Sequence, residues 1–254
     1  MAAGSPTGMA GTLNYGIDAP ARVRSFFSRG VWTLLFALAL YFMNRVQYPG
    51  PSLRLGGTVA LIGVAFLAAG AVMLWCSRTG KLRLRDQLLD TLTLEGSERV
   101  LDAGCGLGLL GIAIAKRLKS GKVIAADTWE ARRLRGCTIE NARENAKLEG
   151  VAEKGVEKIR FENLDWDKLV YPNANFDVVV SALAIHELAD PEARDKAVRE
   201  LFRVLKPGGR MLIHDVLHAR EYARFLTEAG AQDVVVGSTS YLWFLPAQTV
   251  TARK

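Results

Sequence analysis

The part of this chain best suited to chemistry is an acid followed by closely spaced glycines. Asp102 ends a short apolar segment, and glycines follow at Gly104, Gly106 and Gly108. Apolar residues typical of a helix begin at Leu109. Glycine lets the backbone approach a ligand closely and adopt a positive φ, and the free N–H groups at a helix start favour anionic or polar groups. Strand, glycine turn and helix in this order indicate a loop that binds a nucleotide-type cofactor.

Two cofactor classes fit this loop. The segment Gly106–Gly111 satisfies G-x-G-x-x-G, the dinucleotide pattern, although one match of this kind is weak. The stretch beginning at Asp102 resembles the first motif of class I S-adenosylmethionine (SAM) methyltransferases. A carboxylate suits the ammonium and sulfonium of SAM and repels a pyrophosphate. The loop therefore favours SAM over NAD, and a glycine turn that binds no ligand is a third interpretation.

A second acid follows the next expected strand. The apolar segment Lys122–Ala126 ends at Asp127, where a carboxylate can accept hydrogen bonds from both ribose hydroxyls of an adenosine. NAD and SAM both contain this ribose, so Asp127 supports an adenosine cofactor without choosing between them. The alternative is that Asp127 only caps the following turn.

Strands and helices alternate from Arg99 onward, which predicts a parallel sheet covered on both faces. The segment Phe176–Ala182 is nearly continuously apolar, as expected for a strand buried on both sides. A turn as short as Ser238–Ser240 predicts that the two closing strands form an antiparallel pair at the edge.

Residues 86–254 resemble a class I SAM-dependent methyltransferase of the small-molecule branch. The match is carried by RVLDAGCGLGLLGIAIAKRL, VIAADTWE, NLDW, FDVVVSALAIHEL and ELFRVLKPGGRMLIHDV, in that order. The resemblance implies an α/β fold with a Rossmann-like, seven-stranded sheet whose last strand is antiparallel. The chain lacks the Asn-Pro-Pro-Tyr type of motif, which puts methylation of bases and of glutamine in doubt.

The resemblance also implies the residues that bind SAM. The glycine loop would hold the methionine part and Asp127 the ribose, while Thr128 and Trp129 would flank the adenosine. Asp165 and Trp166 would contact the adenine, and Ser181 would lie under the cofactor. The full set is Asp102, Gly104, Cys105, Gly106, Gly108, Asp127, Thr128, Trp129, Asp165, Trp166 and Ser181.

His186 is the best candidate for a catalytic base, which methyl transfer needs only if the acceptor arrives protonated. It follows the strand Phe176–Ala182 and, as an imidazole, titrates near neutrality. A histidine at a helix start that is satisfied by the backbone is an equally good interpretation. Weaker candidates at similar strand ends are Glu187, His214 and Asp215.

Charge and cysteines exclude other classes. Residues 1–85 hold nine Arg or Lys and one acid, so the net charge of +7 comes from this segment. The rest is nearly neutral, which argues against nucleic-acid binding. The three cysteines and three histidines show no metal-ligand spacing, so we expect no metal site and reduced thiols.

Two uncharged runs predict a transmembrane hairpin. The first lies between Arg29 and Arg45, and the second, residues 55–77, is long enough to cross a bilayer. The excess of Arg and Lys outside the connecting turn predicts a multi-pass protein with its catalytic domain in the cytoplasm. A pair of buried core helices is the alternative. The expected organisation is a flexible segment 1–29, a hairpin 30–77, an amphipathic linker helix 78–95 and a methyltransferase domain 96–254.

The sequence therefore predicts a membrane-anchored SAM-dependent methyltransferase. Its expected partners are the lipid bilayer and a small-molecule or lipid acceptor, because the visible acceptor-binding insertion is small and the bilayer surface could complete the pocket. The alternatives are a nicotinamide-dependent oxidoreductase and a SAM-binding membrane protein without catalytic activity.

Overall fold

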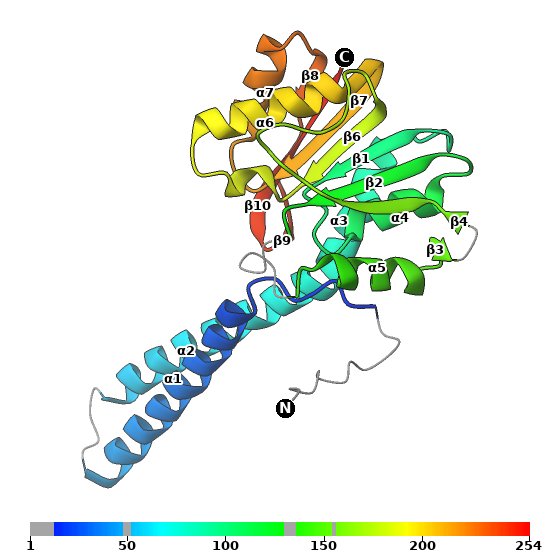
Figure 1. Cartoon of the computed structure of the whole chain (residues 1–254). Coiled ribbons are helices and arrows are strands. Elements are labelled where there is room, and N and C mark those ends of the chain that lie inside the picture. The colour runs from blue at the N-terminus through cyan, green and yellow to red at the C-terminus, as the bar shows by residue number, and fades with distance from the viewer. Residues whose placement is uncertain (1–12, 48–51, 130–135, 154–155) are drawn as a thin grey trace, which may run out of the picture. The chain divides into compact units, whose positions relative to one another are not determined.

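A computed structural model describes residues 13–47, 52–129, 136–153 and 156–254 (Figure 1). The chain divides into two compact units. The larger unit comprises residues up to 16 together with residues 84–241 and 245–254. The smaller unit comprises residues 17–83 and 242–244. Each unit is described by itself below.

The larger unit is built on a mixed sheet with the strand order β5-β2-β1-β6-β7-β10-β8. These seven strands are β1 (Arg99–Ala103), β2 (Lys122–Asp127), β5 (Ile159–Asn163), β6 (Phe176–Ala182), β7 (Leu205–Asp215), β8 (Gln232–Val236) and β10 (Leu245–Arg253). Strand β10 is antiparallel to both β7 and β8, whereas β5, β2, β1, β6 and β7 pair in parallel. The expected seven-stranded sheet with an antiparallel last strand is confirmed.

Three short strands lie outside this order. Strand β9 (Ser240–Trp243) pairs with β10, and β3 (Ala152–Glu153) pairs with β4 (Val156–Glu157) in a small separate hairpin. The β3–β4 hairpin was not expected, because two residues are too few to show a strand pattern in the sequence.

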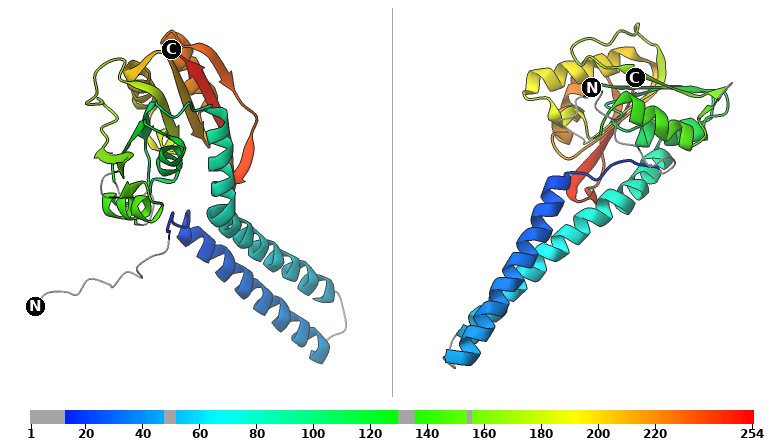
Figure 2. Two further views of the ribbon diagram at one scale, coloured as in Figure 1. Left: turned by 90° about the vertical axis from the view of Figure 1, so that its right-hand side faces the viewer. Right: turned by 60° about the horizontal axis from the view of Figure 1, so that its bottom comes forward.

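Helices cover both faces of the sheet (Figures 1 and 2). They are α4 (Leu109–Arg117), α5 (Ile139–Leu148), α6 (Pro191–Val204) and α7 (Ala219–Glu228). The chain builds outward from β1 to β2 and β5, and in the other direction from β6 to β7. Right-handed crossovers therefore place α4 and α5 on one face and α6 and α7 on the other. The carboxyl ends of β1 and β6 form the switch point where such folds bind ligands.

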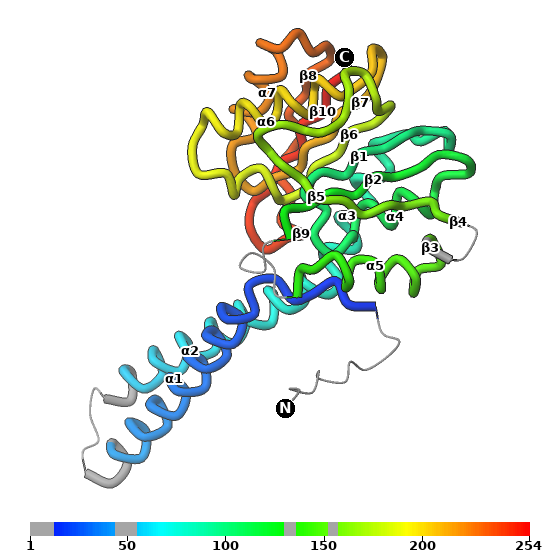
Figure 3. The backbone as a smooth tube through the Cα atoms, in the orientation of Figure 1, coloured from blue at the N-terminus to red at the C-terminus, as the bar shows by residue number. Residues whose placement is uncertain are grey.

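The central strands form the core of this unit, and Figure 3 traces β1, β2 and β6 side by side through it. Leu101 on β1 and Val178, Val179 and Val180 on β6 are all 0% exposed. Burial of side chains that point to both faces explains the continuous apolar run of β6.

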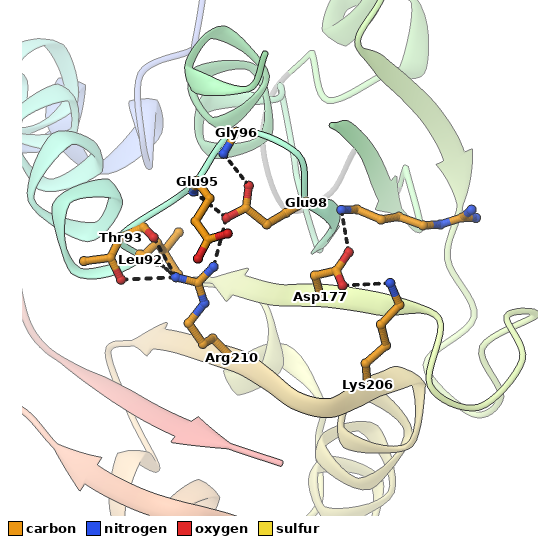
Figure 4. Close-up of polar contacts among 9 residues, drawn as sticks. Leu92, Thr93, Glu95, Gly96, Glu98, Asp177, Lys206 and Arg210 are labelled. Carbon is orange, nitrogen blue, oxygen red and sulfur yellow. Dashed lines mark hydrogen bonds and ion pairs between the residues drawn. The ribbon is translucent and has the colours of Figure 1, made fainter. Parts of the chain in front are cut away.

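A polar cluster closes the amino ends of the strands, away from the switch point (Figure 4). Arg210 of β7 pairs with Glu98 at 2.9 Å and donates to the carbonyl oxygens of Leu92 and Thr93. Glu98 also accepts from the backbone N–H groups of Glu95 and Gly96. These bonds attach the segment after helix α3 (Lys81–Thr91) to the sheet, so we interpret the cluster as structural.

The smaller unit contains two long helices, α1 (Pro20–Gln47) and α2 (Ser52–Trp75). Helix α1 begins at Pro20 rather than at residue 30, because proline suits the first helical position and arginine side chains can project from a helix. A π-helix, Cys76–Gly80, joins α2 to α3 at the start of the expected linker segment. The first twelve residues of the expected flexible segment lie outside the described residues.

Glycines bring α1 and α2 close together. A Cβ on Gly30 would lie 2.6 Å from Leu67 and 3.0 Å from the carbonyl oxygen of Gly63. A Cβ on Gly63 would in turn lie 2.8 Å from Leu34. Close approach at small residues is typical of helix pairs in membranes.

The outward faces of these helices are apolar. Two stretches, Pro20–Met43 and Leu55–Thr91, are long and apolar enough to cross a membrane by length and composition. Large hydrophobic side chains exposed on them include Trp32, Leu35, Phe36, Leu38, Phe42, Leu61, Ile62, Val64 and Val72.

Candidate active site

The glycine loop between β1 and α4 requires glycine at two positions for steric as well as conformational reasons. Gly104 and Gly108 have φ values of 77° and 83°. A Cβ on Gly104 would lie 2.2 Å from Ala184 Cβ, and one on Gly108 would lie 2.8 Å from Ile112 Cδ1. A side chain at either position would therefore clash and strain the backbone. The loop is thus held between α4 and the segment after β6.

Asp127 fastens this loop to the end of β2. Its Oδ2 accepts from the N–H of Gly106 at 2.8 Å, and its Oδ1 accepts from the N–H of Trp129 at 3.0 Å. Each carboxylate oxygen can accept a further hydrogen bond. The carboxylate is therefore oriented by the backbone and retains the capacity to bind two neighbouring hydroxyls, as a ribose requires.

Asp102 lies beneath the loop and is 1% exposed. Its Oδ2 has no hydrogen-bond partner among the described residues, and the nearby backbone N–H of Gly111 acts to lower the pKa of this carboxyl. Burial, with a further contribution from Asp127, raises the pKa of Asp102 from 3.8 to about 7. A cationic ligand nearby would favour the ionised form, so this carboxyl fits the charge of SAM.

Four other predicted cofactor residues are Thr128 and Trp129, which follow β2, and Ser181 and Cys105, which are buried. Trp129 has a φ of 56° and donates from its ring to the carbonyl oxygen of Glu162, beside Thr128 and the anchored Asp127. Ser181 is buried, and its Oγ has no hydrogen-bond partner among the described residues. Cys105 is also buried within the loop.

Asp165 and Trp166 differ from each other in exposure. Asp165 is exposed and accepts from the N–H of Asp167 at 2.9 Å in its own turn. Trp166 is only 9% exposed, belongs to the core, and would lie 3.4 Å from a Cβ on Gly104. The structure thus places Trp166 against the glycine loop, while the contact of both residues with adenine stays a prediction.

His186 is paired with a buried carboxylate at the ends of β6 and β7. Its Nδ1 lies 2.5 Å from Asp215 Oδ1, and its backbone N–H donates to Asp215 Oδ2 at 2.9 Å. The alignment of Ala182 with His214 in the two parallel strands brings these residues together. The sequence left two interpretations of His186: a catalytic base, or a histidine whose hydrogen bonds are made only by the backbone. The contact of its ring with Asp215 favours the first, which stays a prediction.

Asp215 is itself held from several directions. It is 2% exposed and accepts from the N–H of Val216 and from the hydroxyl of Tyr222 at 3.2 Å. Arg194 of α6 donates to the carbonyl oxygen of Leu188, which fixes the other end of the His186 segment. Nothing in the sequence distinguished Tyr222 or Arg194 from ordinary helix residues, so sequence reasoning missed both.

His214, one of the weaker candidates for a base, does not suit that role. It is 1% exposed, its Nδ1 lies 2.8 Å from Thr249 Oγ1, and burial lowers its pKa from 6.5 to about 4. A neutral buried imidazole holds β7 to β10 instead. Glu187, another weaker candidate, is half-buried and is the next residue after His186.

Within the described residues, no cluster of three His, Cys, Asp or Glu side chains could hold a metal ion.

The strand order, the glycine loop and the anchored Asp127 together define a class I SAM-dependent methyltransferase domain. A family model described as "Methyltransferase domain" matches residues 100–209, so this part of the chain is a class I SAM-dependent methyltransferase domain. Asp102 Oδ2 and Ser181 Oγ have no hydrogen-bond partner among the described residues, and each Asp127 oxygen can accept a further bond, which fits SAM as the cofactor of this domain.

Relatives of known sequence and structure agree with this family. The chain is 34% identical to the 27-O-demethylrifamycin SV methyltransferase of Amycolatopsis mediterranei, over 53% of this chain and 44% of that protein. It is 31% identical to the demethylmenaquinone methyltransferase of Thermus thermophilus, over 52% of this chain and 53% of that protein. The chain thus spans about half the length of these curated relatives.

A solved structure supports the fold. A SAM-dependent methyltransferase from Aquifex aeolicus aligns with a TM-score of 0.51 and 24% identity, over 68% of this chain and 92% of that one.

Proposed function

We propose that the chain is a membrane-anchored methyltransferase that transfers a methyl group from SAM to a small, lipophilic acceptor carrying an acidic O–H or C–H group. The observation that carries this proposal is the pair formed by His186 and the buried Asp215. His186 is two residues after Ala184, which contacts the glycine loop at Gly104, and Asp215 reaches His186 from the end of β7. A base beside the cofactor loop is useful only if the acceptor has a proton to lose.

The residues of the pair divide the work of proton removal. SAM supplies a methyl group activated by its sulfonium. Asp215 Oδ1 lies 2.5 Å from His186 Nδ1, and a carboxylate this close favours the tautomer with its proton on Nδ1. In that tautomer the lone pair is on Nε2, where the ring can take the acceptor's proton. Asp215 then stabilises the imidazolium that forms, while Tyr222 and the backbone N–H of Val216 keep the carboxylate in place.

Three features support a membrane-anchored enzyme with a small-molecule acceptor. The apolar outer faces of α1 and α2 are suited to a bilayer, and their glycine contacts are typical of membrane helices. The Arg and Lys residues that flank the two helices favour a multi-pass topology with the catalytic unit in the cytoplasm. Two relatives are named as methyltransferases of 27-O-demethylrifamycin SV and of demethylmenaquinone, which supports a small-molecule acceptor.

A methyl-transfer assay on lipid extracts tests the proposal. Full-length protein in vesicles is incubated with SAM that carries a radiolabelled methyl group, and label is followed into organic-soluble and aqueous products. We expect label in the organic phase with wild-type protein, little with His186→Asn, and a normal amount with the control His218→Asn. Transfer to water-soluble acceptors alone would contradict the lipophilic acceptor. SAM binding without transfer to any acceptor would contradict the enzyme.

A further inference from the structure

Three residues of the N-terminal segment, before α1, form a contact with the cofactor domain that the proposed function does not use. Asn14, Tyr15 and Gly16 lie against the larger unit, and we refer to these three residues as the strap. Asn14 Oδ1 accepts from the N–H of Gly16 at 2.9 Å, and Gly16 has a φ of 74°, so the strap has a defined turn.

One buried amide joins the strap to the glycine loop. Asn145 of α5 is 3% exposed, and its Nδ2 donates to the carbonyl oxygen of Leu107 at 3.1 Å. The same Nδ2 donates to the carbonyl oxygen of Asn14 at 3.0 Å, while Oδ1 accepts from the N–H of Asn14 at 3.1 Å. Asn145 therefore forms a two-point contact with the strap and a third bond with the loop. Leu107 stands between two of the cofactor-binding glycines, Gly106 and Gly108.

A second contact reaches the helix that follows the loop. The hydroxyl of Tyr15 donates to Glu149 Oε1 at 3.1 Å, and Glu149 Oε2 lies 2.5 Å from Lys116 Nζ of α4. Burial opposes the charge of Glu149, but the hydrogen bonds from Lys116 and Tyr15 hold its pKa below the ordinary value. The strap thus contacts α5 directly and α4 through one carboxylate.

We propose that the strap is part of the SAM-binding machinery, and that Asn145 is a positioning residue which couples strap docking to the conformation of the glycine loop. A loop with positive φ at three glycines loses much conformational freedom when it is fixed. The strap holds the amide of Asn145 in the orientation that fixes the carbonyl of Leu107. By linkage, bound SAM strengthens strap docking by the same factor as the docked strap strengthens SAM binding.

The sharpest test is Asn14→Pro, which removes the N–H that donates to Asn145. It leaves in place both side chains that hydrogen-bond the glycine loop, Asn145 and Asp127. Asn14→Ala is the matched control, because it loses the same side chain but keeps the N–H. We expect Asn14→Pro to weaken SAM binding about 3- to 10-fold relative to Asn14→Ala, the value of one net hydrogen bond. Calorimetric titration of full-length protein in nanodiscs measures this ratio.

Two further measurements separate coupling from general damage. Asn145→Ala should weaken SAM binding more than 10-fold, and adding Asn14→Pro to it should cause little further loss. Hydrogen exchange should show that SAM protects residues 13–16 in Asn14→Ala and much less in Asn14→Pro. Equal SAM affinity of Asn14→Pro and Asn14→Ala, or strap exchange that SAM does not change, would overturn the proposal. Both readouts are independent of the acceptor and of methyl transfer.

Discussion

Replacement of Asp102 by asparagine tests whether one buried carboxyl governs the pH dependence of stability. The pKa of Asp102 rises from 3.8 to about 7 through burial. Between these values the folded chain binds a proton that the unfolded chain has released, so stability is lost as the pH rises from about 4 to about 7. Above pH 7 the ionised, buried carboxyl costs on the order of 4 kcal/mol.

Asp102→Asn cannot ionise and should escape this loss. Between pH 5 and pH 8 the wild type loses about 2.7 kcal/mol of this stability, because pH 5 is two pH units below a pKa of about 7. At about 2 °C per kcal/mol for a chain of this size, its Tm should therefore fall by roughly 5 °C more than that of Asp102→Asn. The assay is thermal unfolding in detergent without SAM, followed by intrinsic fluorescence. Asp233→Asn is the control, since it removes an exposed carboxylate at a φ of 51° that asparagine tolerates.

For SAM binding, ionisation of Asp102 has the opposite effect: it lowers the stability of the free protein but strengthens the binding of the cofactor. A cationic ligand favours ionised Asp102, so wild-type affinity for SAM should strengthen as the pH rises through about 7, whereas Asp102→Asn should bind more weakly and with a flatter pH profile. If wild type and Asp102→Asn show the same pH dependence of both Tm and SAM affinity, the reasoning about Asp102 is wrong.

Three other substitutions probe the site. His186→Asn should lower kcat about 10²- to 10⁴-fold with little change in the Kd of SAM, and a large change in Kd would argue against a base. Asp127→Ala should raise the Kd of SAM at least about 10-fold in calorimetry, because the ribose loses its acceptor and the loop its anchor. Gly104→Ala should abolish SAM binding, and Ala184→Gly added to it should restore binding only in part, since the clash is relieved while the positive φ remains; full recovery would contradict the conformational argument.

Much of the fold was visible in the sequence because local patterns determine it. The glycines after Asp102 and the apolar run of β6 each indicate an element and its order along the chain. A short closing turn indicated the antiparallel last strand. The start of α1 was placed too late because its first turns are rich in arginine, although Pro20 is itself a helix-start signal.

The site was harder to predict because it depends on strand register and on contacts distant in sequence. His214 and Asp215 are neighbours at one strand end, yet only Asp215 reaches His186, since adjacent residues of a strand point to opposite faces. The sequence does not show which of these two side chains, His214 or Asp215, points toward His186. The contact of Asn14 with Asn145 joins residues 131 positions apart, and no pattern in either segment indicates it.

The position of β10 determines when the domain can finish folding. Among the described strands, β8 is hydrogen-bonded to the sheet only through β10, although it precedes β10 in the chain. A ribosome-bound chain that still lacks β10 therefore exposes an open edge along β7, where foreign strands can add. Truncations within the last ten residues should consequently release two strands at once and yield aggregated protein.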